Sequence, residues 1–194
     1  MELPANTDPP KRKRTVFITL LATGIFLLGA GLIIPLVNAR QAALQSVIPA
    51  LAPSKLKVAA PALSLNDLQG NPVSLEAYHG QVVLVNNWAI WCPPCQAEMP
   101  ELQAFYNTHS ADGFVLIGIE SGESADQVSA FVNEYGLTFP IWLDPGIIAL
   151  EAFKNWNLPS SYVIDRDGIM RWSFVGAIDQ QMLERYVTPL LEEK

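Results

Sequence analysis

The stretch QVVLVNNWAIWCPPCQAEMP, from Gln81 to Pro100, joins an apolar run to both cysteines of this 194-residue chain. Residues 81–86 are short and almost continuously apolar, which is typical of a central strand covered on both faces. Cys92 and Cys95 follow, separated by two prolines. Prolines fit the first turn of a helix, where backbone N–H groups have no partner within the helix. The stretch therefore predicts a strand, a short loop and a helix that begins beside Cys92.

The position of Cys92 favours thiol chemistry. Free N–H groups and the positive end of the helix dipole stabilise a thiolate at a helix N-terminus. A Cys-X-X-Cys thiol placed there can have a pKa well below ~8.5. Cys95 is one turn inside the helix, so it is expected to be more shielded and to attack a mixed disulfide formed at Cys92. A bridge between the two closes a very short loop, which makes it a poor stabiliser of the fold.

Residues 15–37 contain no charged residue. At ~1.5 Å per residue, a helix of this length spans ~35 Å, enough for a hydrocarbon core of ~30 Å. The basic cluster Lys11–Arg14 precedes it, and basic flanks stay on the cytoplasmic side. The segment predicts a membrane anchor with the rest of the chain extracytoplasmic. A cleaved signal peptide is the alternative, but secretory apolar cores usually run ~7–15 residues.

We expect four parts along the chain: a cytoplasmic N-terminus over 1–14, a transmembrane signal anchor over 15–37, a linker over 38–61 and one domain over 62–194. The domain size suits a single hydrophobic core. From Lys55 onward there are 7 Lys and Arg against 17 Asp and Glu, a balance of −10. This acid excess argues against nucleic acid as a partner and against docking of the domain on anionic lipid.

The exported part shows alternating strand and helix patterns, which predict an α/β fold with a mixed sheet and helices on both faces. The Asp167-Gly168 pair predicts a hairpin turn, and Pro100 is expected to kink its helix. The expected strands are 63–65, 73–75, 81–86, 114–119, 139–143, 161–165 and 169–175, and the expected helices are 93–108, 124–135, 144–153 and 179–191. Cys92 then lies at the carboxyl end of a central strand, where the chemistry of such sheets gathers.

The motif VVLVNNWAIWCPPCQAEMP strongly resembles the thioredoxin superfamily, and more narrowly its TlpA/ResA-like branch. The segments APALSLNDLQGNPVSLEAYHGQ and LPSSYVIDRDG resemble the same branch, so that the likeness covers residues 59–192. It implies a thioredoxin-like fold with an N-terminal β extension and a central insertion. It also implies a membrane-anchored, extracytoplasmic thiol–disulfide oxidoreductase, in a branch that includes proteins serving cytochrome c maturation.

The resemblance assigns roles residue by residue. Cys92 and Cys95 match the redox pair, and Glu98 matches an acid that tunes the thiol pKa values and relays protons. Glu101 is the competing carboxylate. Pro159 matches a cis-proline, which places the backbone of Leu158 where it can pair with a substrate strand.

The expected substrate-binding residues lie in two segments, one beside the cysteines and one near residue 159. They are Trp91, Pro93, Leu158 and Pro159. Trp88 is expected to be a core residue.

Four positions depart from the family pattern. Asn86 replaces the buried Asp of thioredoxins proper, which transfers proton handling to Glu98. Asn87 replaces a large apolar residue, and the one physical reason that the sequence suggests is a partly exposed strand face. Ser160 and Ser161 stand where threonines are more common.

Three other functions agree less well with the sequence than a redox dithiol does. Two thiolates can hold Cu(I), but His79 and His109 are not obvious additional ligands. Peroxide reduction requires a Thr or Ser before the reactive cysteine and a partnering Arg, and residues 86–91 offer neither. A nonenzymatic membrane adaptor does not explain the motif. We therefore predict an enzyme without metal or cofactor, with protein disulfides as substrates and a membrane thiol-transfer protein as electron donor.

Overall fold

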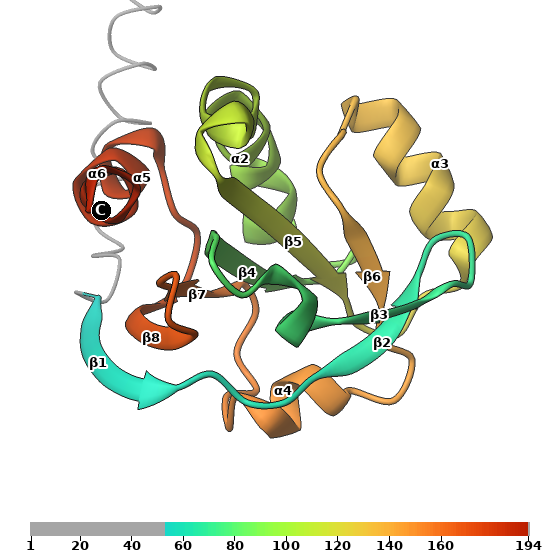
Figure 1. The fold of residues 1–194 in the computed structure, drawn as a ribbon. Helices are drawn as coiled ribbons and strands as arrows, with labels where there is room; N and C mark the ends of the chain where they lie inside the picture. The colour runs from blue at the N-terminus through green and yellow to red at the C-terminus, as the bar shows by residue number, and fades with distance from the viewer. Residues whose placement is uncertain (1–52, 194) are drawn as a thin grey trace, which may run out of the picture. The chain divides into compact units, whose positions relative to one another are not determined.

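The computed structural model describes residues 53–193, which contain an eight-stranded mixed sheet (Figure 1). The strand order is β1-β8-β7-β4-β5-β6-β2-β3, with β4, β5 and β6 parallel to one another and the other pairs antiparallel. This confirms the predicted α/β fold with a mixed sheet. The strands are β1 (Ser54–Ala59), β2 (Ser64–Asp67), β3 (Pro72–Ser74), β4 (Val82–Trp88), β5 (Phe114–Glu120), β6 (Ile141–Leu143), β7 (Ser160–Ile164) and β8 (Ile169–Val175).

Strand β4 is the centre of the domain, because all of its residues are buried. Val82 and Leu84 face one core cluster, and Val83 and Val85 face another, as the two-residue period of a strand requires. The first cluster packs under α2, α3, α5 and α6, and the second packs against α4, so that helices cover both faces as predicted (Figure 1). The helices are α2 (Pro93–His109), α3 (Ala125–Tyr135), α4 (Ile148–Ala152), α5 (Gln180–Tyr186) and α6 (Thr188–Glu192).

The sheet begins earlier than the sequence predicts. Residues 54–59, placed in the 38–61 linker, form β1 and pair with β8 at the edge of the sheet. Exposed lysines on this strand suit an edge, where they oppose pairing with other chains. The expected cytoplasmic segment 1–14 and anchor 15–37 lie outside the described residues. Within residues 53–193, no helix is both long enough and apolar enough to span a bilayer.

The helix predicted from Asp144 begins later than expected. The buried Asp144 carboxylate accepts hydrogen bonds from the backbone N–H groups of Ile148, at 2.8 Å, and Ala149, at 2.7 Å. Asp144 therefore binds the start of α4, but the prediction that it is the N-cap residue and Pro145 the first helical residue is wrong, because Ile147 is the N-cap. A turn intervenes, in which Ile147 adopts a left-handed backbone with φ 55°.

The last predicted helix is divided in two. Asp179 caps α5 through the N–H of Met182, at 2.8 Å, as expected. The helix then ends at Tyr186, and α6 carries Pro189 in its first turn. Proline has no N–H to donate and its ring clashes with the preceding turn, which favours a break between α5 and α6 at this position.

Other helix predictions agree with the structure. Ser124 and Gln127 form the expected reciprocal capping box at the start of α3, and Gly136 ends that helix in the left-handed region with φ 63°. Helix α2 continues through Pro100 to His109. The kink expected at Pro100 stays a prediction.

Gly118 should be intolerant of even one added methyl group, because it lies in the closely packed layer beside Asn86 of the neighbouring strand. A Cβ at this position meets Ile141 Cδ1 at 2.9 Å, Phe139 Cε2 at 3.0 Å and Trp88 Nε1 at 3.1 Å. We predict that Gly118→Ala lowers the free energy of unfolding by about 1–3 kcal/mol, measured by urea denaturation.

Gly146→Ala is the matched control for this substitution. The nearest atom to an added Cβ there is Ile148 Cγ1 at 3.4 Å, an ordinary contact. Equal stability of the Gly118→Ala variant and the parent protein would show that the packing around β5 yields more easily than the contacts indicate.

Candidate active site

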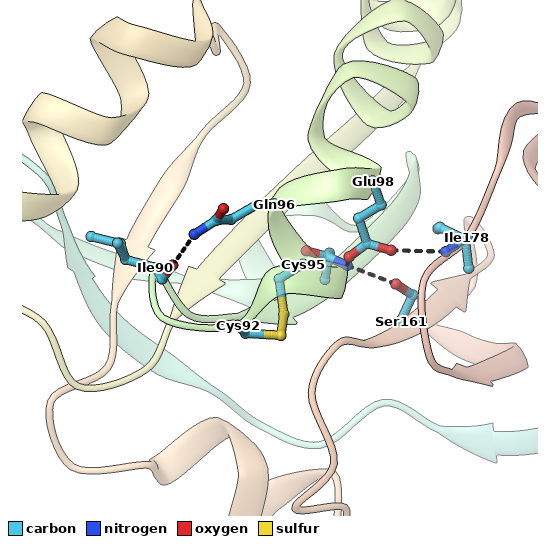
Figure 2. The surroundings of a disulfide bond; sticks show 8 residues. Ile90, Cys92, Cys95, Gln96, Glu98, Ser161 and Ile178 are labelled. Carbon is cyan, nitrogen blue, oxygen red and sulfur yellow. Dashed lines mark hydrogen bonds between the residues drawn. A yellow bond between two sulfur atoms is a disulfide. The ribbon is translucent and has the colours of Figure 1, made fainter. Parts of the chain in front are cut away.

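Cys92 and Cys95 form a disulfide at the start of α2 (Figure 2). Their Cα atoms are 5.3 Å apart, and Cys92 is the N-cap residue of the helix. Cys92 is 3% exposed and Cys95 is fully buried, which agrees with the expected difference in shielding. The N-cap residue makes no side-chain hydrogen bond to the helix, and Pro93 and Pro94, which follow it, have no backbone N–H to donate. A thiolate there faces the positive end of α2.

The loop before Cys92 is held by hydrogen bonds rather than left open. Gln96 on the first turn of α2 donates from Nε2 to the carbonyl oxygen of Ile90, at 2.6 Å (Figure 2). The backbone N–H of Cys92 donates to the carbonyl of Ala89, at 3.2 Å. These contacts fix the path from β4 into α2 and hence the position of the first sulfur.

Glu98 lies one helical turn after Cys95, on the buried face of α2, and is only 2% exposed (Figure 2). Its Oε1 accepts from Nδ2 of Asn86 at 2.8 Å, and its Oε2 accepts from the backbone N–H of Ile178 at 2.8 Å. Burial raises the pKa of Glu98 to about 7, although the two hydrogen bonds oppose the shift. A carboxyl group whose pKa is about 7 can both donate and accept a proton near neutral pH.

The two asparagines of β4 explain the departures noted in the sequence. Asn86 lies opposite Ser161 in the β4–β7 pair and donates to its Oγ at 2.9 Å, while Asn87 lies opposite Ser160 and donates to its Oγ at 3.4 Å. Adjacent strand residues point to opposite faces, so the two pairs join β4 to β7 from both sides. Asn87 is fully buried, which corrects the idea that its strand face is exposed.

The segment around Pro159 lies at the same end of the sheet as the disulfide. The Leu158–Pro159 peptide bond is cis, as the resemblance implies. Because β7 runs antiparallel to β4 with Ser160 opposite Asn87, the start of β7 meets the carboxyl end of β4. Leu158 is half-buried against the core cluster that contains both cysteines. The substrate-binding roles of Leu158 and Pro159 stay predictions.

Trp91 and Pro93 flank Cys92 on the outside of the molecule. The Trp91 side chain is 65% exposed and Pro93 is also exposed, so both can meet a partner. By contrast, Trp88 is fully buried, as expected for a core residue.

The competing carboxylate, Glu101, is exposed and accepts from the backbone N–H of Gln180 at 3.2 Å. Its environment resembles an ordinary helix surface, whereas that of Glu98 is buried and directed toward β4. His109 lies near the end of α2, 3.6 Å from an Asp112 oxygen. Within residues 53–193, no group of three or more His, Cys, Asp or Glu side chains is arranged to hold a metal ion.

The sequence alone did not identify a second buried carboxylate, Glu120. Glu120 ends β5 with no exposed surface, and its Oε2 accepts from the backbone N–H of Glu123 at 3.0 Å. Burial raises the pKa of Glu120, and the backbone N–H groups of Glu123 and Ile90 partly oppose the shift. The sequence signal for this residue was its position directly after the apolar run 114–119. Strand β5 includes Glu120, one residue more than predicted, and so the side chain is buried with the strand.

A dithiol at a helix N-terminus, a buried acid and a cis-proline on a thioredoxin-like sheet define the class of thiol–disulfide oxidoreductases. The AhpC/TSA family model matches residues 56–173. The chain is 34% identical over 128 residues to the thiol-disulfide oxidoreductase ResA of Bacillus thuringiensis, covering 66% of this chain and 74% of the relative. It is 32% identical to ResA of Halalkalibacterium halodurans, covering 63% and 70% of the two chains.

Solved structures show the same relationship. A thioredoxin-family thiol:disulfide interchange protein from Chlorobium tepidum superposes with a TM-score of 0.64 at 27% identity, covering 71% of this chain and 99% of that one. StoA from Bacillus subtilis superposes with a TM-score of 0.57 at 25% identity, covering 66% and 96%. The chain belongs to the AhpC/TSA family and, within the thioredoxin superfamily, to its TlpA/ResA-like thiol–disulfide oxidoreductases.

The raised pKa of Glu98 makes stability depend on pH. The folded protein holds the Glu98 proton up to about pH 7, whereas the unfolded chain releases it near the ordinary value of 4.5. The free energy of unfolding should therefore fall by roughly 3 kcal/mol as pH rises from below 4.5 to above 7. We predict that Glu98→Gln removes this fall, measured by urea denaturation of the disulfide form at several pH values.

Glu101→Gln serves as the control, since it removes an exposed carboxyl group from the same helix. It should keep the pH dependence of the parent protein. If Glu98→Gln keeps it too, Glu98 is not the group that titrates.

Proposed function

We propose that this oxidoreductase is an extracytoplasmic, membrane-anchored reductase of protein disulfides that uses the Cys92/Cys95 dithiol. The observation that carries the proposal is the Cys92–Cys95 disulfide at the start of α2, with buried Glu98 one turn behind it. The direction of electron flow, toward the substrate, rests on the TlpA/ResA-like resemblance and on ResA as a relative.

In the first step, reduced Cys92 attacks as a thiolate. It forms a bond to one sulfur of the substrate disulfide, and the substrate S–S bond breaks. The other substrate sulfur leaves as a thiolate and takes a proton. The N-terminus of α2 favours the Cys92 thiolate over the thiol.

In the second step, Cys95 resolves the mixed disulfide. The Cys95 thiol loses its proton and attacks the Cys92 sulfur, and the second substrate sulfur leaves. Two electrons pass from the dithiol to the substrate, and the Cys92–Cys95 disulfide of this structure is the product form. Glu98, with a pKa of about 7, accepts the Cys95 proton inside the domain, where water has little access.

The location and the partners follow from the first 37 residues and the family resemblance. The uncharged segment 15–37 behind a basic cluster supports an anchor in the lipid bilayer with the dithiol outside. A reductase outside the cytoplasm needs electrons from inside, so a membrane thiol-transfer protein is proposed as the donor. Oxidised proteins on the cytochrome c maturation route are the proposed substrates, by analogy with the TlpA/ResA-like branch.

Substitution of Cys92 and substitution of Cys95 should have different effects on the reaction. With insulin as the disulfide substrate and dithiothreitol as the electron source, Cys92→Ser should show no turnover above background, because the attacking sulfur is absent. Cys95→Ser should also lose turnover. When the reduced variant is freed of dithiothreitol before insulin is added, it should accumulate a mixed disulfide through Cys92, seen as a larger species on non-reducing gels.

The double variant Cys92→Ser/Cys95→Ser should form no such adduct. Parental turnover in either single variant would contradict the two-step mechanism.

A further inference from the structure

Glu120 is a buried acid that the proposed chemistry does not use. It ends β5 opposite Trp88, the last residue of β4, and has no exposed surface. Removing a carboxylate from water costs free energy, which is why burial raises the pKa of Glu120. Its Oε2 accepts from the backbone N–H of Glu123, at 3.0 Å, and this bond closes the turn after β5. The bond accounts for one of the two carboxyl oxygens.

A second segment reaches the Glu120 carboxyl group, and this is the loop that leads to the dithiol. The backbone N–H of Ile90 stabilises the Glu120 carboxylate. The approach is looser than an ideal hydrogen bond, since Oε1 is buried and has no full partner within residues 53–193. The strand ends explain this proximity, because the N–H of Ser121 donates to the carbonyl of Trp88 at 3.0 Å and so holds the end of β5 beside the start of the loop.

Ile90 is held at its carbonyl oxygen as well. Gln96, on the first turn of α2, donates to this oxygen from Nε2 at 2.6 Å (Figure 2). Glu120 on β5 and Gln96 on α2 therefore contact one residue from two sides, at its N–H and at its C=O. Two residues further on, the N–H of Cys92 donates to the carbonyl of Ala89 at 3.2 Å. These contacts decide the path of the loop into the dithiol.

The helix gives the Cys92 sulfur little hold from the other direction. Pro93 and Pro94 occupy the first two positions of α2 and have no backbone N–H to donate. Glu98 makes its hydrogen bonds to β4 and to the segment before α5, and not to the loop. The sulfur therefore depends on the loop for its position at the positive end of the helix.

We propose that Glu120 and Gln96 are positioning residues for the thiol reaction, which hold Ile90 between them and so keep the Cys92 sulfur where the dipole of α2 stabilises its thiolate. Neither residue touches the substrate, and neither transfers a proton. The inference rests on the proposed role of Cys92 as the attacking sulfur, and it is independent of the direction of electron flow.

The test uses the full-length protein with Cys95→Ser, in which Cys92 is the only thiol. Its rate of reaction with the chromogenic disulfide dithiobis(nitrobenzoate) at pH 7 measures the reactivity of that sulfur alone. Glu120→Gln leaves an amide oxygen that accepts from one N–H group instead of two, and Gln96→Ala removes the donor to the Ile90 carbonyl. Each should slow the reaction about tenfold, because a small displacement of a reacting group has a large effect on rate.

The combined variant separates a shared effect from two independent ones. Glu120→Gln with Gln96→Ala should also react about tenfold more slowly, rather than about a hundredfold, because both substitutions release the same residue.

The thiolate fraction of Cys92 is a readout that a merely structural role would not move. In the Cys95→Ser protein at pH 7, the ultraviolet absorbance of the thiolate should fall about threefold in both single variants, since the sulfur leaves the helix N-terminus. Gln96→Ala changes no charge, so its effect reports position alone.

Each substitution has a matched control. Asp144, directly after β6, is also a fully buried carboxyl group that holds backbone N–H groups, but these belong to α4. Gln103 also donates from α2 to a loop, at 2.8 Å to Thr138. Asp144→Asn and Gln103→Ala should keep the parental rate and thiolate fraction, even where they lower the free energy of unfolding. All rates are compared under conditions in which urea denaturation shows the variants to be folded.

Four results overturn the inference. A parental rate in Glu120→Gln or in Gln96→Ala would show that the residue does not position the sulfur. Equal losses in the controls would show a general loosening of the domain. A hundredfold loss in the combined variant would show that the two residues act separately. A larger thiolate fraction in Glu120→Gln would show that its charge acts directly on the sulfur.

Failure of the proposed function gives a different result. In that case Cys92 does not react with the chromogenic disulfide in the Cys95→Ser protein, before any further substitution is made. That outcome would overturn the role of Cys92 as the attacking sulfur and the inference that rests on it.

Discussion

The hydrogen bond from Asn86 to Glu98 joins the central strand of the sheet to the helix that carries the dithiol. A carboxyl group at this depth needs partners, and it finds them in the Asn86 amide and in the backbone N–H of Ile178. The same Asn86 amide reaches Ser161 on β7, so one side chain connects the strand before the cysteines with the strand after the cis-proline. Asn86 therefore links α2, which carries Glu98 and Cys95, to the start of β7, which follows the proposed substrate-binding residue Pro159.

This arrangement supports the proposed direction of electron flow, from the dithiol to the substrate. A carboxylate close to the dithiol disfavours a nearby thiolate, because like charges repel at short range with little water between them. The dipole of α2 favours the thiolate at Cys92, which keeps the first sulfur reactive. The buried acid acts against a fully ionised reduced state, and this stabilises the disulfide form relative to the dithiol. A more stable disulfide is the mark of a reductant.

Most of the fold could be predicted, because the strongest signals are local. The apolar run before the cysteines, the capping box at Ser124 and the Asp167-Gly168 turn are each decided by neighbouring residues. Strand β1 was missed because its exposed edge position gives it almost no apolar pattern. The left-handed turn at Ile147 was missed because it depends on the buried Asp144 carboxylate, a contact across several residues. In the site, the cysteines and Glu98 could be chosen from the motif, but the pairing of Asn87 with Ser160 and the burial of Glu120 required the register of distant strands.

The central claim is that the Cys92/Cys95 pair works as a reductant under the influence of buried Glu98. Its most direct test is the equilibrium reduction potential of this couple at pH 7, measured on the purified protein in thiol–disulfide buffers. The account predicts a value near about −270 mV, in the thioredoxin range. A value near about −120 mV would make the protein an oxidant that installs disulfides, and would contradict the account. Failure to form a reversible disulfide would contradict it as well.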